Sequence, residues 1–256
     1  MPPQRGLITV HTPDVIHALC LAGLSTALGW SAWSGSYTQL ATPRTLPFLV
    51  FASLLTGILA LLSISGRLGI TPRKLRATLV AVVIPTLAIV IPLHTASTSS
   101  GFDEYAGGRA IAITTTSGKG LHGLDRTSRH ITISNDEFAD WYQTIDHNPS
   151  TYVGYTVTVT GFVSRDDTSD ASESTSSTEF GLSRQFMSCC ILDMTPIGFT
   201  SSWSSAATLR NYRWISVTGT LTEQQIGRVG HRHQGVVLAV SSVSSAQAPT
   251  GYFYQP

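Results

Sequence analysis

Three long runs without a formal charge lie in the first hundred residues, and they constrain the fold more than any other feature. The runs are Val15–Trp33, Leu46–Ile64 and Ala77–Leu93. Each can cross a hydrocarbon core of about 30 Å as a helix that rises about 1.5 Å per residue. None shows the polar face of a helix on a soluble domain. The sequence therefore predicts a membrane protein with three transmembrane helices in residues 1–94.

The first run has an alternative interpretation as a cleaved signal peptide. Its apolar stretch is long, and no A-x-A cleavage pattern follows it, so we favour a retained helix. In the third run, Pro85 and Pro92 each remove a helix hydrogen bond and predict a kink.

Basic residues in the loops predict the orientation. The segment 66–76 contains Arg67, Arg73, Lys74 and Arg76, whereas the segment 34–45 contains only Arg44. Basic loops stay in the cytoplasm. The N-terminus is then cytoplasmic, and after three crossings the rest of the chain is extracytoplasmic. This predicts a multi-pass protein of the plasma membrane.

The second half of the chain is typical of a soluble domain. Residues 95–130 are rich in Ser, Thr and Gly without a clear period and are predicted to be a linker. Ser134 and Glu137 have the spacing of a capping box, and the apolar spacing that follows predicts a short helix over 135–146. Residues 131–256 would form one domain.

Alternating β-branched residues then predict strands. They are expected at 156–162, 185–193, 213–221 and 235–243, and an acidic, Ser-rich loop is expected at 166–179. Gly161 and Gly219 follow the similar strings VTVT and ISVT, where a bulge or bend is expected. Short strands with matching glycines favour a small β-barrel of the OB type, with a β-sandwich as the alternative.

Charge and motifs narrow the classes of function. A net charge of +1 gives no electrostatic reason to expect a nucleic-acid partner, which we therefore exclude at this point. No nucleophile elbow, phosphate loop, dinucleotide fingerprint or complete zinc motif occurs, so we expect a protein that is not an enzyme. Three cysteines, two of them adjacent, provide no disulfide framework.

Four side chains are candidate metal ligands. Cys189 and Cys190 are adjacent, and thiolates suit zinc and copper(I). On a strand, however, adjacent side chains point to opposite faces, which favours one Cys in the barrel and one outside it. His231 and His233 would share one face of a strand as half of a zinc or copper site, with a solvated turn as the alternative. Asp193 is expected to cap the turn that follows the Cys pair, and Arg184 precedes the pair.

Several strings occur in an order that resembles a known family. They are ITISNDEF, YVGYTVTVTGFV, RQFMSCCILDMTPIGF, WISVTGTL and the terminal PTGYFYQP, all after the hydrophobic runs. Together they resemble the YcgQ-like family of bacterial membrane proteins, which are described as permease subunits found beside a larger predicted permease of the ArsP type. The resemblance implies a polytopic permease partner in the lipid bilayer. The His-rich metal-binding stretch that some members carry between the second and third spans is missing here.

Three functions follow as hypotheses. The first is a non-catalytic accessory subunit whose extracytoplasmic domain gates or delivers solute to a permease, in a role connected with metal homeostasis. The second is a membrane-anchored extracytoplasmic module that binds a metal or another ligand. The third, ranked last, is a thiol redox enzyme that uses the Cys pair.

Overall fold

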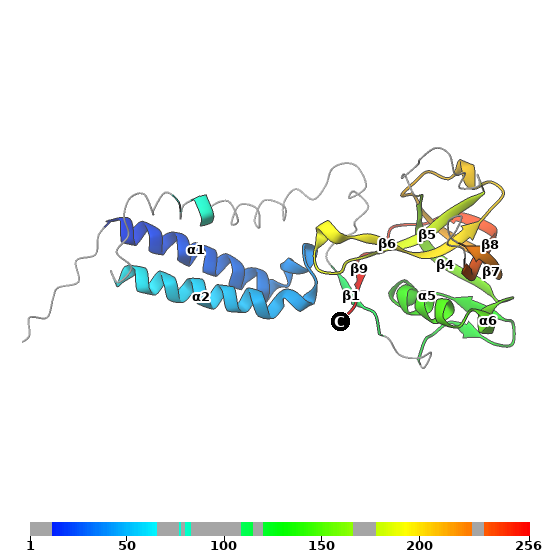
Figure 1. Ribbon diagram of the computed structural model, residues 1–256, viewed down its shortest axis with the longest axis horizontal. Coiled ribbons are helices and arrows are strands. Elements are labelled where there is room, and N and C mark those ends of the chain that lie inside the picture. Colours follow the sequence, from blue (N-terminus) through cyan, green and yellow to red (C-terminus); the bar gives the residue numbers. More distant parts are fainter. Residues whose placement is uncertain are drawn as a thin grey trace, which may run out of the picture. The chain divides into compact units, whose positions relative to one another are not determined.

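The protein consists of two compact units, Met1–Ser99 and Ser100–Pro256, each described by itself. In this computed structural model the structure describes residues 12–65, 77, 80–82, 109–114, 120–165, 178–226 and 233–256. Figure 1 shows a pair of long helices in the first unit and a barrel with short helices in the second.

Two helices of the first unit are long and apolar enough to cross a membrane, by length and composition. They are α1 (Thr12–Ser34) and α2 (Leu46–Ile64), and they cover the first two predicted spans. Two 3-10 turns, η1 (Ser36–Gln39) and η2 (Pro43–Thr45), connect them. Three spans are not shown, because most of the predicted third span, 77–93, lies outside the described residues.

Small polar residues bring α1 and α2 together. The Ser25 hydroxyl donates to the Ser53 carbonyl over 2.7 Å, and the Ser53 hydroxyl donates to the Ser25 carbonyl over 2.9 Å. A β-carbon on Gly29 or Gly57 would lie only 3.1 Å from the opposite serine hydroxyl. Close approach through small residues is the usual packing of transmembrane helices. The outer faces carry apolar side chains such as Trp33, which is 88% exposed.

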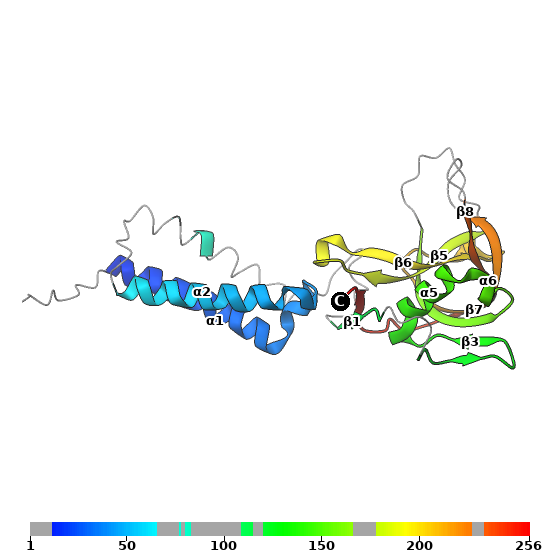
Figure 2. The same ribbon diagram turned by 60° about the horizontal axis from the view of Figure 1, so that its bottom comes forward.

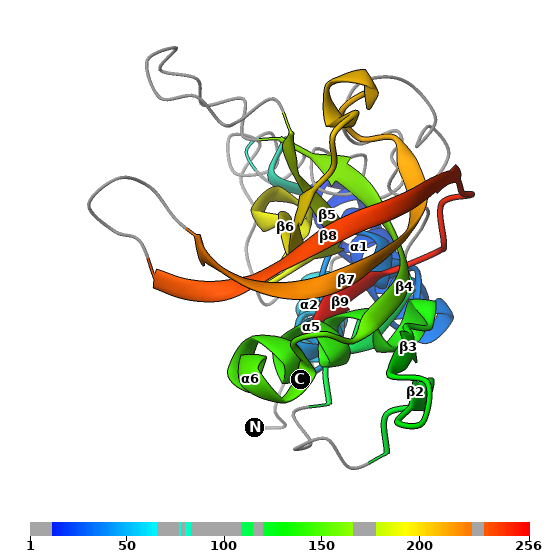
Figure 3. The same ribbon diagram turned by 90° about the vertical axis from the view of Figure 1, so that its right-hand side faces the viewer.

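Five strands of the second unit form a closed barrel. They are β4 (Thr156–Ser164), β5 (Glu179–Phe186), β6 (Thr195–Ser202), β7 (Trp214–Ile226) and β8 (His233–Ser245). The ladder runs β5-β6-β8-β7-β4 and closes where β4 pairs with β5 (Figure 3). A small barrel was predicted, and the strand order fits the OB type, whereas the sandwich alternative is wrong.

Gly219 and Gly161 lie where the barrel bends. The β7–β8 register shifts between Thr218 and Gly219, which confirms the bulge expected there. Gly161 is next to Phe162, where β4 changes its partner from β7 to β5. A β-carbon on Gly161 would lie 2.9 Å from the Ser183 carbonyl oxygen, so only glycine permits this approach without a shift of the backbone.

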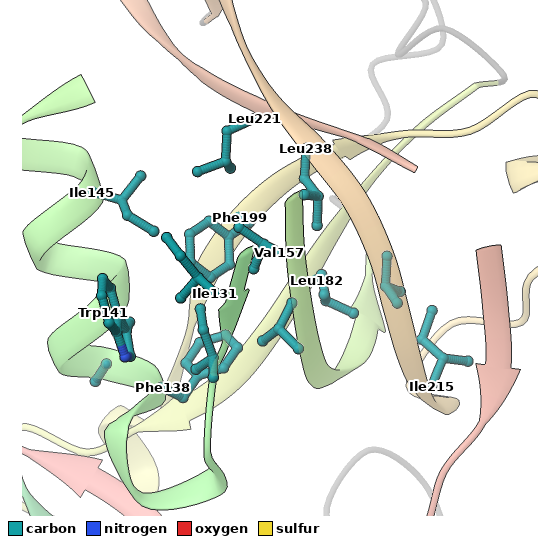
Figure 4. Close-up of a cluster of buried hydrophobic side chains, with 14 of the residues drawn as sticks. Ile131, Phe138, Trp141, Ile145, Val157, Leu182, Phe199, Ile215, Leu221 and Leu238 are labelled. Carbon is teal, nitrogen blue, oxygen red and sulfur yellow. The ribbon is translucent and has the colours of Figure 1, made fainter. Parts of the chain in front are cut away.

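A short helix covers the core of the barrel. The chain forms a 3-10 turn, η3 (Asn135–Glu137), then α5 (Phe138–His147) and α6 (Pro149–Tyr152), close to the predicted helix at 135–146. Phe138, Trp141 and Ile145 of α5 point into the core (Figure 4). The predicted capping box does not form with the backbone. Instead the Ser134 hydroxyl donates to the Glu137 carboxylate, which also accepts from the His122 amide.

The remaining strands differ from the prediction. Part of the predicted linker forms strands β1 (Ala110–Ala112), β2 (Leu124–Asp125) and β3 (His130–Thr132). β1 pairs with β9 (Tyr252–Tyr254), and β3 pairs with β4. These strands have two or three residues, too few for a repeating pattern, and long-range partners hold them. The core of the predicted acidic loop, 166–177, lies outside the described residues.

The bulge gives the first prediction. A Gly219→Ala substitution places a β-carbon 2.6 Å from the Ala239 carbonyl oxygen, so the two backbones must separate. We expect a loss of about 1–3 kcal/mol in the free energy of unfolding, measured by chemical denaturation of the full chain in detergent. Ser244→Ala, at an exposed position of β8, is the control and should change stability by less than about 0.5 kcal/mol. A Gly219→Ala variant with the free energy of unfolding of the wild type would contradict the close approach of β7 and β8 at this position.

Candidate metal centre

The Cys pair lies in a turn between β5 and β6, not in a strand. β5 ends at Phe186, which pairs with Thr195 of β6, so the predicted strand over 185–193 is wrong. Met187 is fully buried, and its amide donates to the Phe253 carbonyl over 2.9 Å. The chain then leaves the ladder and forms η4 (Ile191–Asp193). Figure 2 shows this turn, in yellow, at the end of the β5–β6 hairpin.

Asp193 holds this turn together. One carboxylate oxygen accepts the Ser188 amide at 2.9 Å, and the other accepts the amides of Cys189 and Cys190 at 2.6 and 3.3 Å. The Asp193 amide in turn donates to the Cys190 carbonyl over 3.0 Å. These bonds replace the ladder hydrogen bonds that the segment gives up. Asp193 was expected to cap the turn that follows the Cys pair; instead it accepts the amides of the turn that contains the pair, and residues from Thr195 onward form β6.

The turn gathers three ligand atoms. The sulfur atoms of Cys189 and Cys190 and a carboxylate oxygen of Asp193 all lie within 4.8 Å of one another. Two zinc–sulfur bonds of about 2.3 Å allow two sulfurs to lie up to about 4.6 Å apart, so the group is a candidate to hold one ion. The geometric objection from the sequence does not apply, because alternation of side chains holds only within a strand. Cys189 is exposed and Cys190 is half-buried.

The Cys189 thiol and the Asp193 carboxylate also interact through a hydrogen bond. Hydrogen bonds to Asp193 and Cys190 raise the pKa of Cys189 to about 12. Desolvation would raise the pKa of Asp193, but hydrogen bonds from the Cys189 thiol and from the turn's amides outweigh it and lower that pKa. The Cys189 thiol therefore keeps its proton beside the carboxylate. A bound metal cation stabilises the thiolate and displaces that proton.

Only part of the predicted site falls on residues that the structure describes. His231 and the side chain of His233 lie outside the described residues. Cys20 is a free, half-buried thiol on α1 in the other unit. Arg184, which the sequence placed at the far end of the same strand, is 1% exposed and makes no ion pair with Asp193 among those found in the described residues. Asp193 was not among the candidate ligands predicted from the sequence, although the spacing C-C-x-x-D places it close to both cysteines in the chain.

Comparisons with known proteins give one family and one similar structure to report. The DUF1980 C-terminal domain matches residues 114–255, which is more than half of the chain. No curated protein matches. Among solved structures, the mitochondrial single-stranded DNA-binding protein Rim1 from S. cerevisiae is 11% identical, with a TM-score of 0.23, over 38% of this chain and 98% of that chain.

The structural match corrects one expectation. Nucleic-acid partners were excluded because the net charge is only +1. A matching chain is a DNA-binding protein, and a net charge summed over 256 residues does not describe one face of one domain, so the exclusion is withdrawn. At a TM-score of 0.23 the match gives no argument that this chain binds nucleic acid.

Asp193 gives the second prediction. An Asp193→Asn variant loses the charge and one acceptor, so we expect the amides of Ser188, Cys189 and Cys190 to exchange hydrogen at least tenfold faster, followed by mass spectrometry. Because the pKa of Asp193 is lowered, the wild-type turn keeps its protection as pH falls through the ordinary Asp range and loses it only below.

Asp125→Asn is the matched control. The Asp125 carboxylate also accepts two backbone amides, those of Thr127 and Ser128, in a turn elsewhere in the domain. In Asp125→Asn, the amides of Thr127 and Ser128 should exchange hydrogen faster, and the exchange rates of amides 188–190 should stay unchanged. Equal exchange at 188–190 in the wild type and in Asp193→Asn would remove Asp193 as the organiser of the turn.

Proposed function

This chain belongs to the DUF1980 C-terminal domain family, and we propose that it is a membrane-anchored module that binds one soft metal ion through Cys189 and Cys190. The observation that supports the proposal is the spacing of the two sulfurs and the Asp193 carboxylate, all within 4.8 Å. We favour this binding module over the thiol redox enzyme, because redox chemistry of the pair would form a disulfide between adjacent residues, and such a disulfide is strained. All three cysteines are free.

The donor set favours copper(I) or zinc. Thiolates are soft ligands that select these ions. A carboxylate has about four lone-pair positions, and Asp193 already accepts three backbone amides. Asp193 therefore acts mainly by holding the two thiols in place, and it completes the coordination of an ion such as zinc with one remaining lone pair.

The site has the features of an exchangeable centre. Structural zinc sites use four protein ligands and are closed. Here two thiols and one carboxylate stand in an exposed turn, so a bound ion keeps an open position from which another molecule can take it. Such a site suits acquisition or delivery of metal. His231 and His233 as further ligands, and a permease as the receiver, stay predictions from the sequence.

The third prediction concerns metal binding by the full chain in mild detergent. We expect about one equivalent of copper(I), or of zinc, in the wild type and almost none after Cys189→Ser with Cys190→Ser. Asp193→Asn should weaken binding about 10- to 100-fold, because it removes the group that orients both thiols. Metal content by mass spectrometry and competition with a chelator of known affinity measure both effects.

Cys20→Ser is the control and should bind as the wild type does, because Cys20 lies in the other unit. Variants at His231 and His233 test whether the predicted imidazoles add to the site. Equal, near-zero metal in the wild type and the double Cys variant would end the proposal.

The fourth prediction concerns the side of the membrane. The basic segment 66–76 predicts an extracytoplasmic barrel if three spans are present. In a cysteine-free background, a Ser204→Cys thiol on the exposed surface of the barrel domain should react with an impermeant maleimide from outside intact cells. A cysteine placed at 70 should react only after permeabilisation. The reverse pattern would invert the topology.

A further inference from the structure

A second polar site lies beneath the surface of the barrel, at Arg184, five residues before Cys189 in the chain. Arg184 of β5 is 1% exposed, and its guanidinium carbon lies 5.7 Å from the ring centre of Phe138 and 5.3 Å from those of Trp214 and Phe253. Aromatic faces attract a cation, which explains how the charge is tolerated there. They give it no hydrogen-bond acceptor.

One side of the guanidinium has no partner among the described residues. Its Nη1 makes two long contacts to Asn135, 3.4 Å to the carbonyl oxygen and 3.5 Å to Oδ1. Nε and Nη2 are buried and donate to no acceptor in that part of the chain, and the same holds for Nε1 of Trp214. The Nε and Nη2 hydrogens point the same way and form the fork that binds two oxygens of a carboxylate or phosphate.

The charge of Arg184 is also poorly compensated. Burial lowers its pKa to about 10, although the negative charge of Asp136 acts in the opposite direction. The Asp136 carboxylate is already paired with Arg109, which donates two hydrogen bonds to it at 3.0 and 2.6 Å. A buried cation without its own anion is costly. Stability alone would therefore favour an apolar residue at position 184.

We propose that Arg184 and Trp214 form a binding site for an oxyanion that presents two oxygens in one plane. The Nε–Nη2 fork of Arg184 holds both oxygens, and the indole N–H of Trp214 is a third donor. The ligand is the carboxylate or phosphate group of a larger molecule whose apolar part packs against the surrounding rings. Asn135 is exposed and contacts Nη1, so one edge of the guanidinium lies just beneath the surface of the domain.

The test uses the full chain in detergent, with acetate, inorganic phosphate and chloride at equal ionic strength. For the wild type we expect a saturable rise in the thermal midpoint with acetate or phosphate and none with chloride. The oxyanion that acts at the lower concentration identifies the class of ligand. A chloride response equal to the others, or no response to either oxyanion, overturns the proposal.

Variants separate binding from a structural role. Arg184→Lys keeps the charge and loses the fork, so it should weaken the response at least tenfold, and Trp214→Phe should weaken it severalfold. Arg184→Met should not respond, and without ligand its midpoint should equal or exceed that of the wild type. Arg213→Met removes an exposed cation beside Trp214 and should behave as the wild type. An Arg184→Met or Arg184→Lys variant that keeps the full response overturns the proposal.

Discussion

The barrel closes because strand β4 pairs with two other strands of the barrel. It pairs with β7 over residues 156–162 and with β5 over residues 162–164, and Gly161 stands beside the change. Only a residue without a side chain lets β4 pass so close to the Ser183 carbonyl. Because the ladder is closed, none of the five barrel strands is an edge strand of the barrel. The closed barrel surrounds the apolar core, and α5 packs against that core.

Closure also determines what the turn after β5 can do. Phe186 is held in the ladder, and the buried Met187 is tied to Phe253, so the segment begins from a fixed point. Thr195 fixes its other end in β6. Between these points the backbone donors need acceptors, and Asp193 supplies them. The two thiols therefore lie at the end of a hairpin whose turn is held by hydrogen bonds on both sides.

The local sequence predicted some elements well and others poorly. Alternation located β4, β7 and β8, and apolar spacing located α5, because each has one face toward the core. β6 was missed, since the string TPIGFTSS mixes proline, glycine and serine without alternation. The string QFMSCCILD has the composition of a strand, yet hydrogen bonds to Asp193 make most of it a turn. The sequence identified the two thiols as candidate metal ligands, but it predicted that they point to opposite faces of a strand and not toward each other.

The sequence by itself predicted three apolar runs, of which the first two are helices, a small β-domain after them and candidate ligands for a soft metal. These properties depend on the composition of each segment and on the spacing of its apolar residues, and both can be read directly from the sequence. Only the tertiary structure decided that the barrel closes, that the sulfurs approach each other and that Arg184 is buried among three rings. Closure and the burial of Arg184 depend on residues that folding brings together, such as Phe162 with Ser183 or Arg184 with Phe253, and no local pattern encodes such a pairing. The approach of the sulfurs depends on the turn that replaces a strand there, whose ends β5 and β6 hold.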